Sequence, residues 1–85
     1  MPKRTVDILL EIISPEKMLV HQMVSTVELP GTKGRFMVLR GHAPLISSLE
    51  AGNITYTVGD RTKSLRIASG FVEVCKNYVS ACVEL

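Results

Sequence analysis

Short runs rich in valine, isoleucine, threonine and leucine recur along this chain, and residues typical of turns separate them. The runs return about every 8–12 residues, a spacing typical of β-sandwiches and barrels, and helical periodicity is nearly absent. The clearest run alternates strictly, so that one face carries Ile54, Tyr56 and Val58. The first run places on one face Val6, Ile8, Leu10 and Ile12. We therefore expect an all-β domain, with about eight to ten short strands in two antiparallel sheets packed face to face.

Turn residues mark where the expected strands end. Pro30–Gly34 is typical of a turn, Gly59–Arg61 of a tight hairpin, and Ser69–Gly70 is expected to interrupt the chain before the next strand. In the strand expected before Pro30, three side chains share one side: Met23, Val27 and Leu29. No linker or repeat divides the sequence, so residues 1–85 are expected to form one domain.

The two cysteines are expected to be free thiols. If Lys76–Asn77 is a two-residue loop, Cys75 lies opposite Tyr78 and Cys82 lies opposite Phe71. The two cysteines are then about 13 Å apart along the ladder. A disulfide needs Cα atoms within about 7 Å of each other, so the spacing indicates a reducing, cytoplasmic compartment.

Composition excludes several classes of protein. An apolar fraction of 46% is too high for a disordered segment. A net charge of +2 and four aromatic residues without tryptophan do not favour nucleic-acid binding. No apolar run approaches the roughly 20 residues of a membrane span. We do not expect the basic start of the chain to be a secretory signal, because Asp7 and Glu11 interrupt the apolar stretch that follows it.

Residues with catalytic or ligand-binding chemistry show no pattern that would use it. Histidine and cysteine side chains occur without metal-ligand spacing or an orienting third group: His21, His42, Cys75 and Cys82. Gly31–Gly34 resembles part of a phosphate-binding loop but lacks the helix that should follow it. Glu50 and Glu73 are isolated carboxylates with a solvated role as the default. We expect no catalytic residue, metal or cofactor.

A basic cluster is more informative. Lys33, Arg35 and Arg40 lie in a stretch that has no acidic residue between Glu28 and Glu50. This cluster is either a solvated loop face or a docking edge for an acidic or polar partner.

The stretch Gly34–Leu45 resembles Gly-x-x-Gly-Ile-x-Pro-Gly-His-Ala-Pro-Leu, a motif of the epsilon subunit of F-type ATP synthases. Four flanking segments are similar to the same family in the same order: Leu10–Glu16, Val27–Gly34, Leu49–Gly52 and Ala68–Val74. The likeness extends over nearly all of residues 6–85.

This resemblance implies a flattened β-sandwich that performs no chemistry. It implies a rotor, or central-stalk, subunit that docks on the gamma subunit and the c-ring and couples proton transport to ATP synthesis. Such a subunit is peripheral, on the cytoplasmic face of the bacterial inner membrane. The matching gamma-binding positions are Ser14, His42, Ser47 and Ser69. The matching turn toward the c-ring consists of Gly34, Arg35 and Phe36.

Some positions depart from the family pattern. Arg35 stands where the family often has an acid, Met37 where it has glycine, and Arg40 where it has proline. We therefore expect an acidic or polar group on the c-ring loop opposite Arg35. The family usually continues into a two-helix hairpin beyond the position of Leu85, so no ATP binding is expected of these residues alone. The alternative function is a generic small β-sandwich interaction module; a cysteine-dependent hydrolase has no support.

Overall fold

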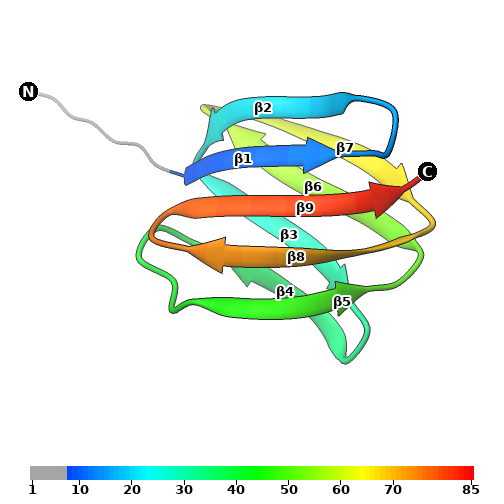
Figure 1. Cartoon of the computed structure of the whole chain (residues 1–85). Helices are drawn as coiled ribbons and strands as arrows, with labels where there is room; N and C mark the ends of the chain where they lie inside the picture. The colour runs from blue at the N-terminus through cyan, green and yellow to red at the C-terminus, as the bar shows by residue number, and fades with distance from the viewer. Residues whose placement is uncertain (1–7) are drawn as a thin grey trace, which may run out of the picture.

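The computed structural model describes residues 8–85, and these residues form nine β-strands and no helix (Figure 1). In chain order the strands are β1 (Ile8–Ile13), β2 (Met18–Val24), β3 (Thr26–Gly31), β4 (Gly34–Val38), β5 (Leu45–Leu49), β6 (Gly52–Val58), β7 (Arg61–Ile67), β8 (Ser69–Cys75) and β9 (Tyr78–Glu84). The expected all-β fold is confirmed.

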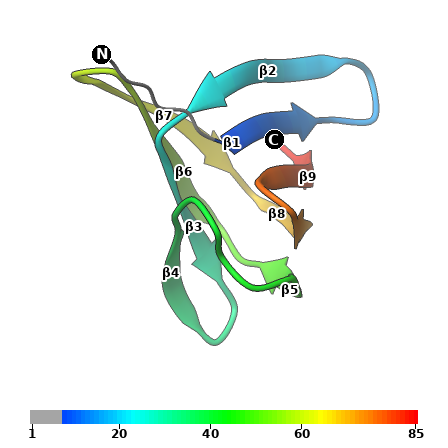
Figure 2. The ribbon, with the colours of Figure 1, turned by 90° about the vertical axis from the view of Figure 1, so that its left-hand side faces the viewer.

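The strands form two layers of one continuous hydrogen-bonded sheet. One layer, which we call the five-stranded layer, has the order β2-β1-β9-β8-β5. The four-stranded layer has the order β4-β3-β6-β7. The layers join where β3 meets β5, at the single pair of Gly31 and Leu49. Figure 2 shows the two layers from the side, so the chain folds as a sandwich with its interior between them.

Alternation along the strands builds the core between the layers. Ile8, Leu10 and Ile12 of β1 are completely buried, as the sequence pattern predicts, whereas Val6 lies outside the described residues. In β6, Ile54 is buried, Tyr56 nearly so, and Val58 packs against the core from its edge. The remaining buried apolar side chains are Val24, Val27, Leu29, Val38, Leu49, Ile67, Val72, Val74, Val79, Ala81 and Val83.

One strand pair departs from the expected antiparallel order. β1 runs parallel to β9, with Leu9 opposite Tyr78 and Ile13 opposite Cys82. The other described pairs are antiparallel. β1 and β9 come from opposite ends of the sequence, so no tight turn fixes their relative direction. The parallel pair joins the β1–β2 hairpin to the β8–β9 hairpin and completes the five-stranded layer.

Two local expectations are corrected. The inward position expected for Met23 is wrong, since its side chain is 51% exposed. The cause is a bend at Ser25, whose amide bonds to the Thr57 carbonyl oxygen at 2.8 Å and breaks the alternation before β3 begins. The interruption expected at Ser69–Gly70 lies one residue earlier, at Ala68, and both residues belong to β8.

The β8–β9 hairpin has the predicted register. Cys75 lies opposite Tyr78 and Cys82 lies opposite Phe71, and both cysteines are free and exposed. Lys76 and Asn77 form the two-residue turn with φ angles of 51° and 62°. No helix among residues 8–85 is long and apolar enough to cross a membrane.

Candidate interaction surfaces

The outer face of the five-stranded layer, the side turned away from the core, carries exposed apolar side chains in rows that cross the strands. Register defines three rows. One row contains Met23, Leu9, Tyr78 and Cys75. The middle row contains His21, Glu11, Ser80, Glu73 and Ile46. The third row contains Met18, Ile13, Cys82, Phe71 and Ser48.

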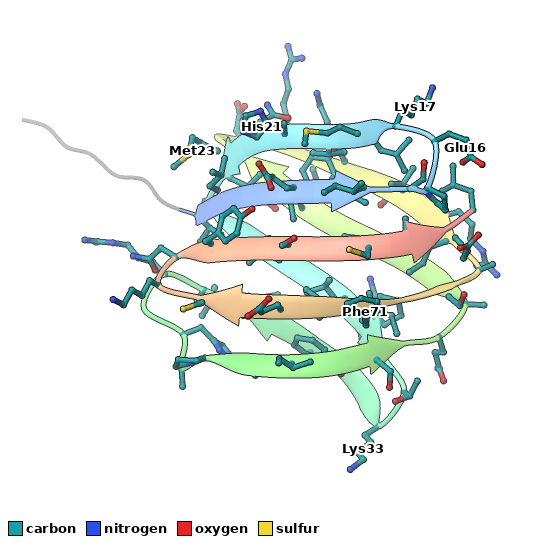
Figure 3. All side chains as sticks on the ribbon, in the orientation of Figure 1. Glu16, Lys17, His21, Met23, Lys33 and Phe71 are labelled. Atoms are coloured by element: carbon teal, nitrogen blue, oxygen red, sulfur yellow. The ribbon has the colours of Figure 1, made fainter. Side chains whose placement is uncertain are left out.

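Large apolar groups on this face are open to solvent. Ile46 is 75% exposed, Phe71 55% and Met23 51%. Figure 3 shows Met23 and His21 projecting from β2 at one edge of the layer, and Phe71 on β8. A scattered exposed side chain is ordinary, but a contiguous set across several strands is typical of an interaction surface.

The Glu11 carboxylate, in the middle row, contacts side chains of both neighbouring strands. It accepts a hydrogen bond from the Tyr78 hydroxyl, and the His21 Nε2 atom lies 3.4 Å from its other oxygen. The hydrogen bond to Glu11 favours the neutral phenol and raises the pKa of Tyr78, with desolvation acting in the same direction. The Glu11 carboxylate therefore already has partners on both adjacent strands.

A depression of about 510 Å³ lies at one end of this face, where β1 ends and β8 begins. Its apolar floor includes Phe71 and Val83, and both Ser14 and Ser69 line it. Ser14 is 6% exposed, and its hydroxyl donates to the Lys17 carbonyl oxygen at 3.2 Å and accepts from the Lys17 amide at 3.3 Å. Ser14 thus stabilises the β1–β2 turn, whereas Ser69 is exposed at the start of β8, opposite Glu84 of β9.

His42 lies at the opposite end of the strands from Ser14 and Ser69, in the loop between β4 and β5. Its Nδ1 atom lies 2.7 Å from the Ala43 carbonyl oxygen, and the neighbouring Gly41 amide donates to the Asn77 side-chain oxygen at 2.7 Å. This bond ties the loop to the β8–β9 turn. A second depression, of about 370 Å³, begins at Pro44 in the same loop and extends to Glu73 and Cys75.

The four positions matched to gamma binding therefore do not form one cluster. Ser14 and Ser69 share a depression, and His42 lies at the far end of the layer. Ser47 pairs with the buried Val72 on the inner side of β5, and its hydroxyl donates to the Ser48 carbonyl oxygen at 3.0 Å. All four positions lie in the five-stranded layer or in loops directly beside it.

The three positions matched to the c-ring turn begin β4, and they follow directly on the Thr32–Lys33 tip of the β3–β4 hairpin. Gly34 has a φ of 128°, a conformation that side chains rarely adopt, so glycine suits this position. Phe36 packs its ring against Gly31, where an added Cβ would meet the ring at 2.9 Å. Lys33 projects from the tip (Figure 3).

Arg35 has partners within its own layer. Its Nε atom lies 3.3 Å from a Glu28 carboxylate oxygen, and a guanidinium nitrogen donates to the Thr55 hydroxyl at 3.3 Å. Glu28 of this chain therefore already pairs with Arg35, and the acidic or polar group expected on the c-ring loop stays a prediction. The basic cluster read from the sequence is also spread out, because Lys33 precedes β4 and Arg40 follows it. These cations do not make one patch.

Sequence reasoning missed the middle row. Glu73 was read as an isolated carboxylate, and no significance was given to Phe71 or Ile46 on the outer face. The β8–β9 register already places Glu73 opposite Ser80. The row becomes visible only with the parallel β1–β9 pairing, which no local signal predicts.

These surfaces offer apolar contact, carboxylates and fixed loops. No group of three or more histidine, cysteine, aspartate or glutamate residues within 8–85 is arranged to hold a metal ion. Exposed apolar patches of this kind are suited to binding another macromolecule.

Residues 7–84 match the family described as the beta-sandwich domain of the ATP synthase delta/epsilon chain, and the chain belongs to this family. The "ATP synthase epsilon chain" of Magnetococcus marinus is 41% identical over 80 residues, which are 94% of this chain and 57% of that protein. The protein of the same name from Koribacter versatilis is 40% identical over 74 residues, which are 87% of this chain and 52% of that protein. The chain spans about half the length of these relatives.

Two solved structures share the fold. A chain in the mitochondrial ATP synthase of Euglena gracilis (OSCP/F1/c-ring) superposes with a TM-score of 0.86 at 20% identity; the match covers 96% of this chain and 53% of that one. A chain in the central stalk/c-ring of the Tetrahymena thermophila mitochondrial ATP synthase gives a TM-score of 0.78 at 13% identity; that match covers 93% of this chain and 64% of the other. At these identities the likeness concerns the sandwich itself.

Proposed function

We propose that this chain is a non-catalytic rotor subunit of an F-type ATP synthase, which docks on the gamma subunit and the c-ring and couples proton transport to ATP synthesis. The observation that carries the proposal is the family match over residues 7–84. The Tetrahymena structure supports it, because its similar chain belongs to a central stalk/c-ring assembly. The proposed location is peripheral, on the cytoplasmic face of the bacterial inner membrane.

The outer face of the five-stranded layer is the proposed gamma-binding surface. Ser14 and Ser69 line a depression at one end of it, and the His42 loop flanks the depression at the other end. Exposed apolar side chains connect the two ends. The Ser47 side chain faces inward from β5. We therefore propose that Ser47 supports the gamma-binding surface by positioning β5.

The tip of the β3–β4 hairpin is the proposed contact with the c-ring. Gly34 and the packing of Phe36 on Gly31 fix its backbone. Because Glu28 already compensates Arg35, we propose that the contact uses the Lys33 side chain and the backbone of the turn. ATP binding is not part of the function proposed for these residues.

Co-purification tests this function. The tagged chain, expressed with the gamma subunit and the c-ring of its own organism, should recover both in fixed stoichiometry. A variant with Lys33→Ser and Gly34→Lys should retain gamma and lose the c-ring. Recovery of neither partner would contradict the proposal and favour the generic interaction module.

A further inference from the structure

The two layers of this small protein carry opposite charge. The strands of the five-stranded layer contain three carboxylates and no lysine or arginine: Glu11, Glu73 and Glu84. The strands of the four-stranded layer contain four cationic side chains and the single acid Glu28: Arg35, Arg61, Lys63 and Arg66. A net charge of +2 for the whole chain hides this separation.

The carboxylates lie among the apolar side chains of the outer face. Glu73 stands in the middle row, next to Ser80 and Ile46. Rows containing Phe71 on one side and Cys75 on the other flank it, each about 7 Å away along the strand. The charge is therefore placed inside the apolar surface and not at its rim.

Glu73 also differs from Glu11 in having no hydrogen-bonding or ionic partner among the described residues. Glu11 contacts the Tyr78 hydroxyl and the His21 ring, Arg35 pairs with Glu28, and Glu73 takes part in none of these contacts. The depression at Pro44 opens beside Glu73. A partner that covers this face removes water from the Glu73 carboxylate, and a buried carboxylate without a partner is costly.

We propose that the outer face of the five-stranded layer is selective for charge as well as shape, and that its occupant presents a lysine or arginine to Glu73 within an apolar contact surface. The inference rests on the proposed function in naming the gamma subunit as that occupant. The Glu73 carboxylate and the cation form an ion pair that apolar side chains shield on both sides. Such shielding reduces screening by salt and makes the pair a determinant of specificity.

The charge distribution argues against other occupants. A second copy docking through the same face would bring carboxylates against carboxylates. An anionic membrane or a nucleic acid would be repelled by the same groups. A head-to-tail contact with the basic four-stranded layer of another copy would also satisfy the charges, and it predicts association of the isolated chain into rings or open-ended assemblies.

Binding of the isolated gamma subunit, measured by titration calorimetry, tests the inference. Glu73→Lys should weaken binding about tenfold or more, and Glu73→Gln should weaken it by a smaller factor. Asp60→Lys is the matched control, because it makes the same charge change in the β6–β7 turn, away from this face. It should bind as the unaltered chain does. Thermal unfolding of each variant should show that all of them fold.

The outcomes separate the inference from the proposed function. Equal binding by the Glu73→Lys and Asp60→Lys variants would overturn the inference and leave gamma docking intact. Absence of binding by the unaltered chain would overturn both. Concentration-dependent association of the isolated chain in sedimentation that Glu73→Lys abolishes, or binding of the unaltered chain to anionic vesicles, would reassign the face and overturn the inference. A lysine or arginine in gamma whose reversal to glutamate restores binding to Glu73→Lys would complete the assignment.

Discussion

Gly70 leaves no room for a side chain where β8 passes β9. A Cβ at this position would collide with the Cys82 carbonyl oxygen and lie 3.0 Å from the Val83 Cα atom. Both obstacles are backbone atoms, so the strands themselves would have to move apart. The residue is therefore needed for close packing of the hairpin, although its φ does not demand glycine.

We predict that Gly70→Ala lowers the free energy of unfolding by about 1–3 kcal/mol, because overpacking strains the β8–β9 ladder. Urea denaturation measures the change. The control is Ser69→Ala at the neighbouring exposed position, which should stay within about 0.5 kcal/mol. Equal stability of the two variants would show that the β8–β9 hairpin accommodates a Cβ at position 70, and it would contradict the prediction.

The Arg35–Glu28 pair explains how a departure from the family pattern is accommodated. The two side chains lie on diagonal positions of β4 and β3, and both are partly exposed. A pair of this kind contributes little by itself, but two like charges at these positions repel each other. Glu28 therefore provides a partner for the Arg35 charge within this chain.

We predict that Arg35→Glu lowers the free energy of unfolding by about 1 kcal/mol and that adding Glu28→Arg restores most of the loss. Urea denaturation of the unaltered chain, the two single variants and the double variant completes a double-mutant cycle. Strictly additive effects would contradict the pairing. Recovery of the c-ring by each variant then reports separately whether the charge of this turn matters to the proposed contact.

At the scale of elements, the β8–β9 turn supports the neighbouring β4–β5 loop. Asn77 adopts a positive φ of 62°, and its side-chain oxygen accepts the Gly41 amide at 2.7 Å. Glycine tolerates the same backbone conformation but lacks the acceptor. The conformational role and the hydrogen-bonding role of Asn77 can therefore be separated.

We predict that Asn77→Gly changes global stability by less than about 1 kcal/mol while the Gly41 amide exchanges with solvent faster. Hydrogen exchange followed by NMR gives both quantities. Lys76→Gly is the matched control, since it alters the same turn and keeps the acceptor, and it should leave Gly41 exchange unchanged. Unaltered protection of Gly41 in Asn77→Gly would mean that the loop is held by other contacts.

Local elements were predictable from sequence, and long-range pairings were not. The Ile54 strand and the register of the Cys75–Cys82 hairpin follow from alternation and turn chemistry, which act over a few residues. The parallel pairing of β1 with β9 joins distant segments, so no local pattern encodes it. Met23 was misplaced because the bend at Ser25 depends on a hydrogen bond to the distant Thr57.

The candidate sites also combine features that were predictable from local sequence with features that depend on long-range contacts. The resemblance identified the β3–β4 turn, but the internal partner of Arg35 required the three-dimensional arrangement of Glu28 and Thr55. The gamma-matched positions lie on one layer, yet the carboxylate central to its outer face, Glu73, emerged only when five strands were placed side by side.

At the scale of the whole molecule, a single sandwich separates two kinds of surface. The five-stranded layer presents apolar and acidic groups, and the four-stranded layer presents polar and basic ones. A component that contacts two partners at once benefits from such a division, because each partner selects its own face. The proposed rotor position of the chain, between gamma and the c-ring, requires that kind of selectivity.

The two native thiols provide the most direct test of where gamma docks. Cys75 and Cys82 are exposed on the outer face of the five-stranded layer, so both should react rapidly with a maleimide in the isolated chain. In the complex with gamma, both reactions should slow about tenfold or more. A cysteine introduced by Thr62→Cys on β7, in the four-stranded layer, should keep its reactivity. Undiminished labelling of Cys75 and Cys82 in the assembled complex would contradict docking through this face.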